Sequence, residues 1–117
     1  MNPAPVKPQI SLEDLERIDI RVGTIDGVSD VPESDKLVSL SVNFGDHIRT
    51  ILVGMKAERE HPSELKGRQA LFVVNLSPRR IAGEVSEGML LDIGYADGIL
   101  PVLAVPETPV PDGCRAG

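Results

Sequence analysis

Aromatic residues are scarce in this sequence, whose 117 residues include two phenylalanines, one tyrosine and no tryptophan. Proteins that bind single strands of nucleic acid regardless of sequence usually stack the bases on several exposed aromatic rings. At least two of the three rings, Phe44, Phe72 and Tyr95, are better explained as core residues. The composition therefore argues against a sequence-tolerant single-strand binder.

Cysteine is almost absent as well, because Cys114 is the only one. A single thiol excludes an internal disulfide and a cysteine cluster for a metal. His47 and His61 lie far apart in the sequence without ligand spacing to Cys114, and no glycine-rich phosphate loop of standard spacing occurs. We therefore predict a protein that is not an enzyme and that holds no metal and no cofactor.

Long hydrophobic runs are missing too. No apolar stretch approaches the roughly 20 residues that a helix needs to span a bilayer. The start of the chain, residues 1–9, is proline-rich and lacks the apolar stretch of a secretion signal. We expect a cytoplasmic protein with no membrane partner.

The sequence also lacks an excess of basic residues. Twelve basic residues against eighteen acidic ones give a net charge of −6, which repels polyanions at long range. The segment 66–83, however, holds basic side chains and no acid, and from Glu84 onward Arg115 is the only basic residue. Any site for a polyanion must therefore be local and built around this segment, whose basic residues are Lys66, Arg68, Arg79 and Arg80.

The length of the chain suits one compact domain. Residues 1–10, which hold three prolines, are expected to form a flexible N-terminal arm, and residues 11–117 the folded domain. Ser11, followed three residues later by Asp14, is typical of a capping box and predicts a short helix. The apolar face of this helix would consist of Leu12, Leu15 and Ile18.

Beyond this helix, apolar residues recur with the period of a β-strand. From Ile20 the alternation is interrupted by two glycines, which indicates a bulged or bent strand. Residues 38–44 alternate most clearly, and residues 48–53 follow a turn as their hairpin partner. Five or six short strands with little helix predict an all-β fold and a small barrel. The remaining predicted strands cover residues 70–76, 89–93 and 99–105.

The segment 75–91 is the candidate binding element. It leaves a predicted strand, passes through a proline and the adjacent Arg79 and Arg80, and re-enters a strand after Gly88. Binding residues often lie on such loops between rigid elements. Arginine matches phosphate oxygens with two hydrogen bonds, and Asn and Ser complete hydrogen bonds to bases or riboses. From these residues alone, an RNA-binding loop and a solvated basic loop both remain open.

Four motifs occur in a fixed order, at residues 19–23 (Asp-Ile-Arg-Val-Gly), 34–37, 63–67 and 75–91. With these motifs the sequence resembles the tRNA-binding domain family, and the resemblance runs from about Ser11 to Arg115. That family comprises stand-alone bacterial tRNA-binding proteins, the CsaA secretion-associated chaperones, and the domain appended to many methionyl-tRNA synthetases and to the cytokine precursor EMAP II. Residues 78–83 and 106–113 are most similar to the CsaA branch.

The resemblance implies an OB-fold five-stranded barrel with a short N-terminal helix and additional C-terminal strands. It further implies a non-catalytic protein that recognises folded tRNA by shape and acts as a homodimer. An alternative within the same family is a CsaA-like export chaperone that holds unfolded preproteins or peptides in an exposed apolar groove.

The family motifs also imply candidate RNA contacts, namely Asn75, Arg79, Arg80, Ser86, Met89, Lys36 and Arg21. Three of them have an alternative reading. Arg21 would equally suit a structural ion pair, Lys36 a solvated loop charge, and Met89 a position in the core.

Overall fold

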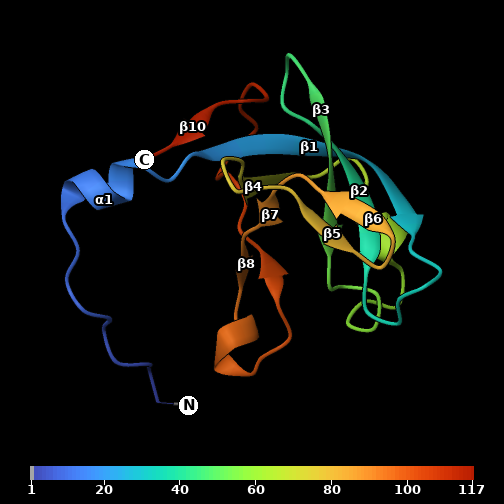
Figure 1. Cartoon of the computed structure of the whole chain (residues 1–117), viewed down its shortest axis with the longest axis horizontal. Helices are drawn as coiled ribbons and strands as arrows, with labels where there is room; N and C mark the ends of the chain where they lie inside the picture. The colour runs from blue at the N-terminus through green and yellow to red at the C-terminus, as the bar shows by residue number, and fades with distance from the viewer. Residues whose placement is uncertain (1) are drawn as a thin grey trace.

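Antiparallel strands make up almost all of the regular structure (Figure 1). The computed structural model describes residues 2–117, and its main sheet has six strands. Five of them follow the order β3 (Ile48–Val53), β2 (Val38–Asn43), β1 (Ile20–Asp30), β4 (Gln69–Val73) and β7 (Met89–Leu90), and the sixth, β10 (Arg115–Ala116), pairs with β1. Two further ribbons pair β5 (Arg79–Ile81) with β6 (Glu84–Ser86) and β8 (Asp92–Ile93) with β9 (Val102–Leu103).

The predicted short helix is confirmed as α1 (Leu12–Glu16), and of the predicted capping box the structure shows the half in which Ser11 is the N-cap. The hydroxyl of Ser11 accepts a hydrogen bond from the amide of Asp14 at 3.0 Å, which satisfies a free donor at the helix N-terminus. The apolar side chains of this helix are exposed, with Leu12 at 70% and Leu15 at 52%. Figure 1 shows why, because α1 lies beside the barrel and not on it. Two 3₁₀ turns, η1 (Pro62–Leu65) and η2 (Tyr95–Asp97), complete the helical segments, and no helix within residues 2–117 is long and apolar enough to cross a membrane.

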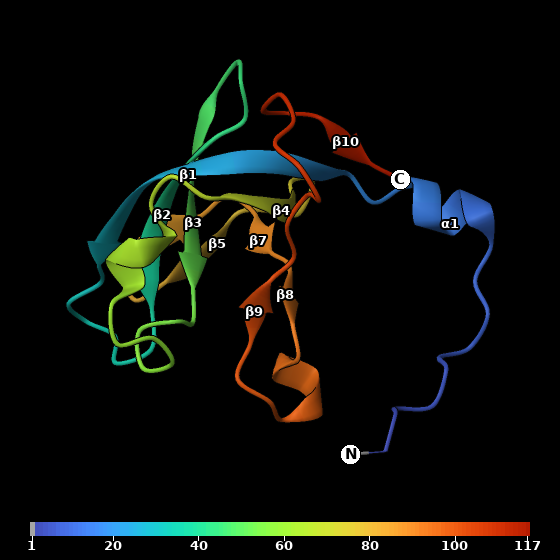
Figure 2. The same cartoon turned by 180° about the vertical axis from the view of Figure 1, so that it is seen from behind.

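Strand β1 organises the barrel because it pairs with β2, β4 and β10. The predicted bulge is confirmed by a register shift between Ile25 and Gly27 in its pairing with β2. Figures 1 and 2 show the strong curvature of this strand from both sides. Gly23 allows the tight packing inside the curve, since a Cβ there would lie 2.6 Å from Cγ1 of Val42.

The core fills the inside of this curved sheet. Residues of β2 alternate between buried and half-buried, as the period-two pattern predicts. Phe44 and Phe72 are both buried, and their rings meet edge to face with centroids 5.6 Å apart. The expectation that two of the three aromatic rings belong to the core is therefore confirmed.

The barrel closes where β3 meets the segment after β6. The amide of Leu52 donates to the hydroxyl of Ser86 at 3.0 Å, and the amide of Glu87 donates to the carbonyl of Thr50 at 2.8 Å. Gly88 permits this approach, because a Cβ there would lie 3.0 Å from the carbonyl oxygen of Val73. The strands β1, β2, β3, β4 and β7 thus form the nearly closed antiparallel barrel of the predicted OB-fold, with one short N-terminal helix and extra strands at the C-terminal end.

The strand predictions for the C-terminal third are wrong in their extent. The predicted strand over residues 89–93 is two strands, because β7 pairs with β4 inside the barrel and β8 leaves it to pair with β9. The predicted strand over 99–105 shrinks to β9, and the one over 70–76 ends at Val73. Apolar side chains such as Ile99 and Val102 made these stretches look like core strands, but they lie exposed on a hairpin that projects from the barrel (Figure 2).

The C-terminal residues 110–116 are held against the barrel by side chains of β1 and β4. The hydroxyl of Thr24 donates to a carboxylate oxygen of Asp112 at 2.6 Å, and the amide group of Gln69 donates to the carbonyl of Val110 at 2.6 Å. Gly113 then turns the chain with a φ of 89°, and its amide donates to the carbonyl of Val22 at 2.7 Å.

The substitution Gly113→Ala is expected to lower the free energy of unfolding by about 2 kcal/mol or more, because alanine is strained at positive φ. In addition, its Cβ would lie 2.3 Å from the carbonyl oxygen of Phe44. Urea denaturation followed by circular dichroism measures the change. Gly54→Ala is the matched control, since a Cβ at Gly54 has open space and its φ is not positive. Equal stability of the two variants would contradict the prediction.

Candidate nucleic-acid interface

The hairpin of β5 and β6 presents the two adjacent arginines. Ala82 and Gly83 form its turn, with φ of 49° and 81°, as a two-residue hairpin connection requires. Both arginines are exposed, but neighbouring residues of a strand point to opposite faces. Arg79 and Arg80 therefore project from opposite sides of the hairpin.

Arg79 is the arginine that faces a cavity of about 570 Å³. The cavity lies between the end of β3, β7 and the β8–η2 segment, and it also brings in a residue from the loop between β1 and β2. Three of the sequence-predicted RNA contacts line it together, namely Lys36, Arg79 and Met89. Glu58, Asp92 and Tyr95 are further polar side chains in the wall.

The backbone of Lys36 is fixed although its side chain is exposed. The hydroxyl of Ser34 accepts hydrogen bonds from the amides of Lys36 and Leu37, each at 3.1 Å. The carbonyl of Lys36 accepts from the amide of Lys56 at 3.0 Å. Within residues 2–117, neither the ammonium of Lys36 nor the guanidinium of Arg79 forms an ion pair. Both cations are therefore available to an anion from solution.

Met89 belongs to the exposed side of β7. Its side chain is 44% exposed, whereas the next residue, Leu90, is buried against the core. The alternative reading of Met89 as a core residue is therefore wrong. Met89 is instead one of the residues that line the cavity, where a soft apolar side chain suits contact with a ribose or a base face.

Ser86 is a buried residue whose hydroxyl has both of its hydrogen-bonding roles filled. It accepts from the amide of Leu52 at 3.0 Å and donates to the carbonyl of Gly88 at 3.1 Å. Because Ser86 is opposite Arg79 in the register of the hairpin, it anchors the hairpin to the barrel close to that arginine.

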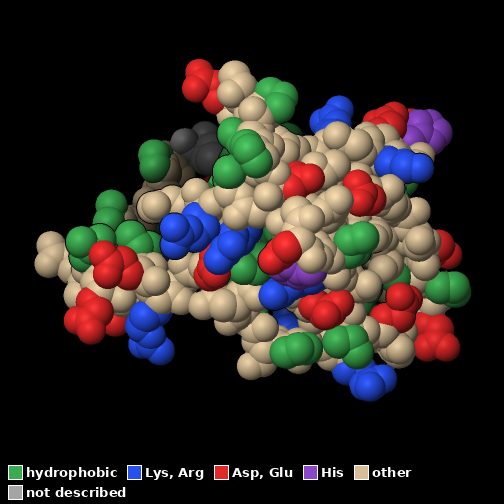
Figure 3. Space-filling view, turned by 90° about the horizontal axis from the view of Figure 1, so that it is seen from above, with side chains coloured by type: hydrophobic (Ala, Val, Ile, Leu, Met, Phe, Trp, Pro, Cys, Tyr) green, Lys and Arg blue, Asp and Glu red, His purple; other side chains and the backbone are tan. Residues whose placement is uncertain are grey.

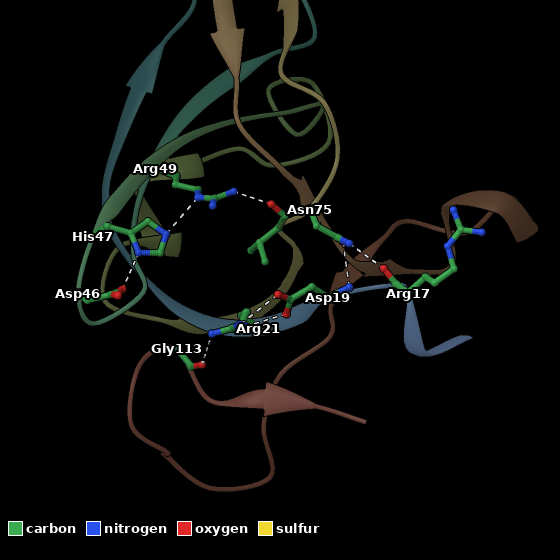
Figure 4. A network of polar contacts seen from close by, with 9 residues as sticks. Arg17, Asp19, Arg21, Asp46, His47, Arg49, Asn75 and Gly113 are labelled. Carbon is green, nitrogen blue, oxygen red and sulfur yellow. Dashed lines mark hydrogen bonds and ion pairs between the residues drawn. The ribbon is translucent and has the colours of Figure 1, made fainter. Parts of the chain in front are cut away.

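Asn75 and Arg21 lie together in a network of polar contacts that does not line the cavity (Figure 4). The side chain of Asn75 accepts from the amide of Asp19 at 2.9 Å and donates to the carbonyl of Arg17 at 2.7 Å. These two contacts tie the connection between α1 and β1 to the end of β4.

Arg21 forms the structural ion pair that was the alternative reading of this residue. Its guanidinium donates to both carboxylate oxygens of Asp19, at 2.7 and 3.0 Å, and to the carbonyl of Gly113 at 3.4 Å. The hydrogen bonds from Arg21 lower the pKa of Asp19 below its usual value, and the same contact raises the pKa of Arg21. Since the pKa of Asp19 is lowered on folding, the pair stabilises the fold above the ordinary pKa of an aspartate and less so as the pH falls below it.

Arg49 is a site residue that the sequence analysis missed. Its guanidinium donates to the carbonyls of Val74 and Glu87, at 2.6 and 3.1 Å. These two carbonyls flank residues 75–86, which contain the β5–β6 hairpin, so one side chain clasps the chain on both sides of that hairpin. A third donation, at 3.1 Å, goes to Nε2 of His47 (Figure 4). No motif or spacing marks Arg49, which reads in the sequence as a solvated strand residue.

The substitution Arg49→Met is expected to loosen the β5–β6 hairpin without unfolding the barrel. Hydrogen bonds from a charged group contribute about 1.5–3 kcal/mol, and partial exposure reduces this. We expect amides of the hairpin to exchange with solvent about fivefold faster, measured by native-state hydrogen exchange. The exposed Arg68, changed to Met, is the control, because its side chain makes no hydrogen bond within residues 2–117. Unchanged exchange in Arg49→Met would disprove the clasp.

Comparison with protein families matches residues 20–115 to the family described as "Putative tRNA binding domain". Among curated relatives, the methionine–tRNA ligase of Bacteroides fragilis is 41% identical over 99 residues, which cover 85% of this chain and 14% of the relative. The methionine–tRNA ligase of Nitrosomonas europaea is 38% identical over 112 residues, which cover 96% of this chain and 16% of the relative. The chain thus spans about a seventh of the length of the curated relatives that it matches.

Two similar solved structures match this chain over almost its whole length and over all of their own. The MetRS-related protein of Pyrococcus horikoshii is 31% identical, with a TM-score of 0.86 over 95% of this chain and all of that one. The CsaA chaperone of Picrophilus torridus is 30% identical, with a TM-score of 0.80 over 93% of this chain and all of that one. With the family match covering most of the sequence and these relatives agreeing in fold, the chain belongs to the tRNA-binding domain family.

Proposed function

We propose that this chain binds folded tRNA without catalysing a reaction, through the surface around the cavity of Lys36, Arg79 and Met89. The observation that carries the proposal is the meeting of two cations, neither of them in an ion pair within residues 2–117, in one cavity of a tRNA-binding domain. They come from segments more than 40 residues apart, which only the barrel brings together. A tRNA partner also makes the cytoplasm the expected location.

In this proposal Arg79 and Lys36 bind backbone phosphates, and Met89 contacts a sugar or base between them. Arg80, on the other side of the hairpin, reaches a second phosphate of the same RNA. The remaining candidates, Asn75, Ser86 and Arg21, act through the structure and not through contact with RNA. Asn75 fixes the start of the binding element, and Ser86 anchors the end of β6 to β3. Arg21 holds the ion pair with Asp19. Because the cations sit on a rigid barrel, their spacing favours a folded RNA whose phosphates have a matching spacing.

We expect Arg79→Glu to weaken the binding of labelled bulk tRNA about tenfold at physiological salt, because it replaces a phosphate contact with a repulsive charge. Fluorescence anisotropy measures the affinity, beside an unstructured RNA of equal length. Arg68→Glu provides a charge-matched control away from the cavity. Binding that is unaffected by Arg79→Glu, or no preference for folded tRNA, would reject the proposal.

The proposal includes a homodimer, supported by apolar side chains that nothing in one chain covers. The helix α1 has only five residues and exposes both of its leucines, although so short a helix needs packing to be stable. Figure 3 shows hydrophobic side chains gathered at the α1 end of the molecule. The β8–β9 hairpin exposes a second set, with Leu100 at 66%. A two-fold axis would place α1 of one protomer on the hairpin of its partner.

Light scattering should accordingly report a mass of about twice 12.6 kDa, and Leu12→Glu together with Leu15→Glu should reduce it to that of one chain. Val85→Glu, at an exposed apolar position of the β5–β6 hairpin, is the control that keeps the dimer mass. A monomer mass for the unchanged protein at micromolar concentration would contradict the dimer.

A second candidate function, the holding of unfolded preproteins or peptides, is supported by the apolar part of the same cavity and by the similarity to CsaA chaperones. Competition separates the two functions. If tRNA displaces a bound peptide, the peptide and the RNA share the cavity. If the protein binds peptide but does not bind tRNA, the chaperone function is the primary one.

A further inference from the structure

We propose that the cavity takes one unpaired nucleotide of the bound RNA and prefers guanine as its base. This inference rests on the proposed function and names the part of the RNA that the cavity recognises. Its starting point is that the cavity wall carries charges of both signs: Lys36 and Arg79 on the one hand, Glu58 and Asp92 on the other.

The two carboxylates are unexpected in a site for phosphate alone. An ionised carboxylate only accepts hydrogen bonds, and it repels the phosphates that Lys36 and Arg79 attract. Within residues 2–117, neither Glu58 nor Asp92 forms an ion pair. A ligand suited to this wall is therefore anionic at the end that meets the cations and presents N–H donors to at least one carboxylate at the other end, as a nucleotide does.

Guanine is the base whose donors fit a carboxylate best. Its N1–H and N2–H groups lie side by side on the Watson–Crick edge and can donate to the two oxygens of one carboxylate. Adenine and cytosine offer one amino group beside an acceptor nitrogen, and uracil offers one N–H between two carbonyls that a carboxylate repels. This edge is free only in an unpaired nucleotide, since base pairing would occupy it.

The side chains available for stacking limit the site to a single base. Tyr95 is 68% exposed and lines the cavity, whereas Phe44 and Phe72 are buried in the core. The thioether of Met89 is the other exposed group suited to a base face. The cavity volume of about 570 Å³ lies within the range of about 300–1,000 Å³ that is usual for small-ligand sites. One aromatic ring and one thioether are enough to contact a single base, but not a run of bases along a single-stranded RNA.

The test is a titration of the isotopically labelled full chain with 5′-GMP, 5′-IMP and 5′-UMP, followed by amide chemical shifts. IMP lacks only the 2-amino group of GMP, so it isolates one of the two proposed hydrogen bonds. We expect shifts in residues 54–58 and 89–95, with IMP binding about fivefold and UMP at least tenfold more weakly than GMP. Equal affinities, or the absence of shifts in these residues, would overturn the inference.

A pair of matched variants tests whether the two carboxylates cause the preference for GMP over IMP. Glu58→Gln combined with Asp92→Asn should reduce the GMP-to-IMP ratio to less than twofold, because a neutral amide accepts more weakly and at one oxygen only. Glu64→Gln, at an exposed residue outside the cavity, should leave the ratio unchanged. A ratio that survives the double variant would overturn the role of the carboxylates.

Bulk tRNA binding distinguishes a failure of this inference from a failure of the proposed function. The double variant should still bind tRNA through Arg79 and Lys36. If the unchanged protein binds tRNA but shows no nucleotide preference, the inference alone is wrong. If an apolar, basic peptide shifts the cavity residues while GMP and tRNA do not, both are wrong.

Discussion

The closure of the barrel between β3 and residues 86–88 is the contact on which the rest of the structure depends. Strand β3 is the edge of the sheet, and its amides at Thr50 and Leu52 need acceptors. Side-chain oxygens of Glu87 and Ser86 supply them. Because the same residues end the β5–β6 hairpin, the hydrogen bonds that close the barrel also hold Arg79 at the cavity. Arg49 reinforces this arrangement from β3, and fold and site therefore share one set of contacts.

The net charge of the chain and the charges that line the cavity act on an RNA at different distances. A net charge of −6 repels an approaching RNA, but salt screens exposed charges beyond about 8 Å at physiological ionic strength. A phosphate already in the cavity is affected mainly by the charges that line it. The wall holds two cations and two carboxylates together with one exposed ring. In the proposed function this mixture gives selectivity more than long-range attraction, and it suits a particular feature of a folded RNA better than adhesion to any polyanion.

Local patterns predicted most of the barrel. The cap at Ser11, the alternation in β2, its hairpin with β3 and the bulge in β1 all depend on residues close in sequence, and all are confirmed. Apart from the predicted strand over 70–76, which ends at Val73, the errors lie in residues 89–105, where the apolar pattern of a core strand occurs in a projecting hairpin. A run of apolar residues does not by itself distinguish a strand inside the barrel from one in a projecting hairpin.

What the sequence by itself determined is the class of fold, the family and the set of candidate residues, because motifs and periodicity are read along the chain. Only the tertiary structure decided which contacts these residues make, because the partner atoms are remote in sequence. Ser86 meets the amide of Leu52 across 34 residues, and Asn75 meets that of Asp19 across 56. The two carbonyls that Arg49 binds lie 25 and 38 residues away. In the same way the closed barrel, and no local signal, turned Arg79 toward the cavity with Lys36 and left Arg80 on the other side of the hairpin.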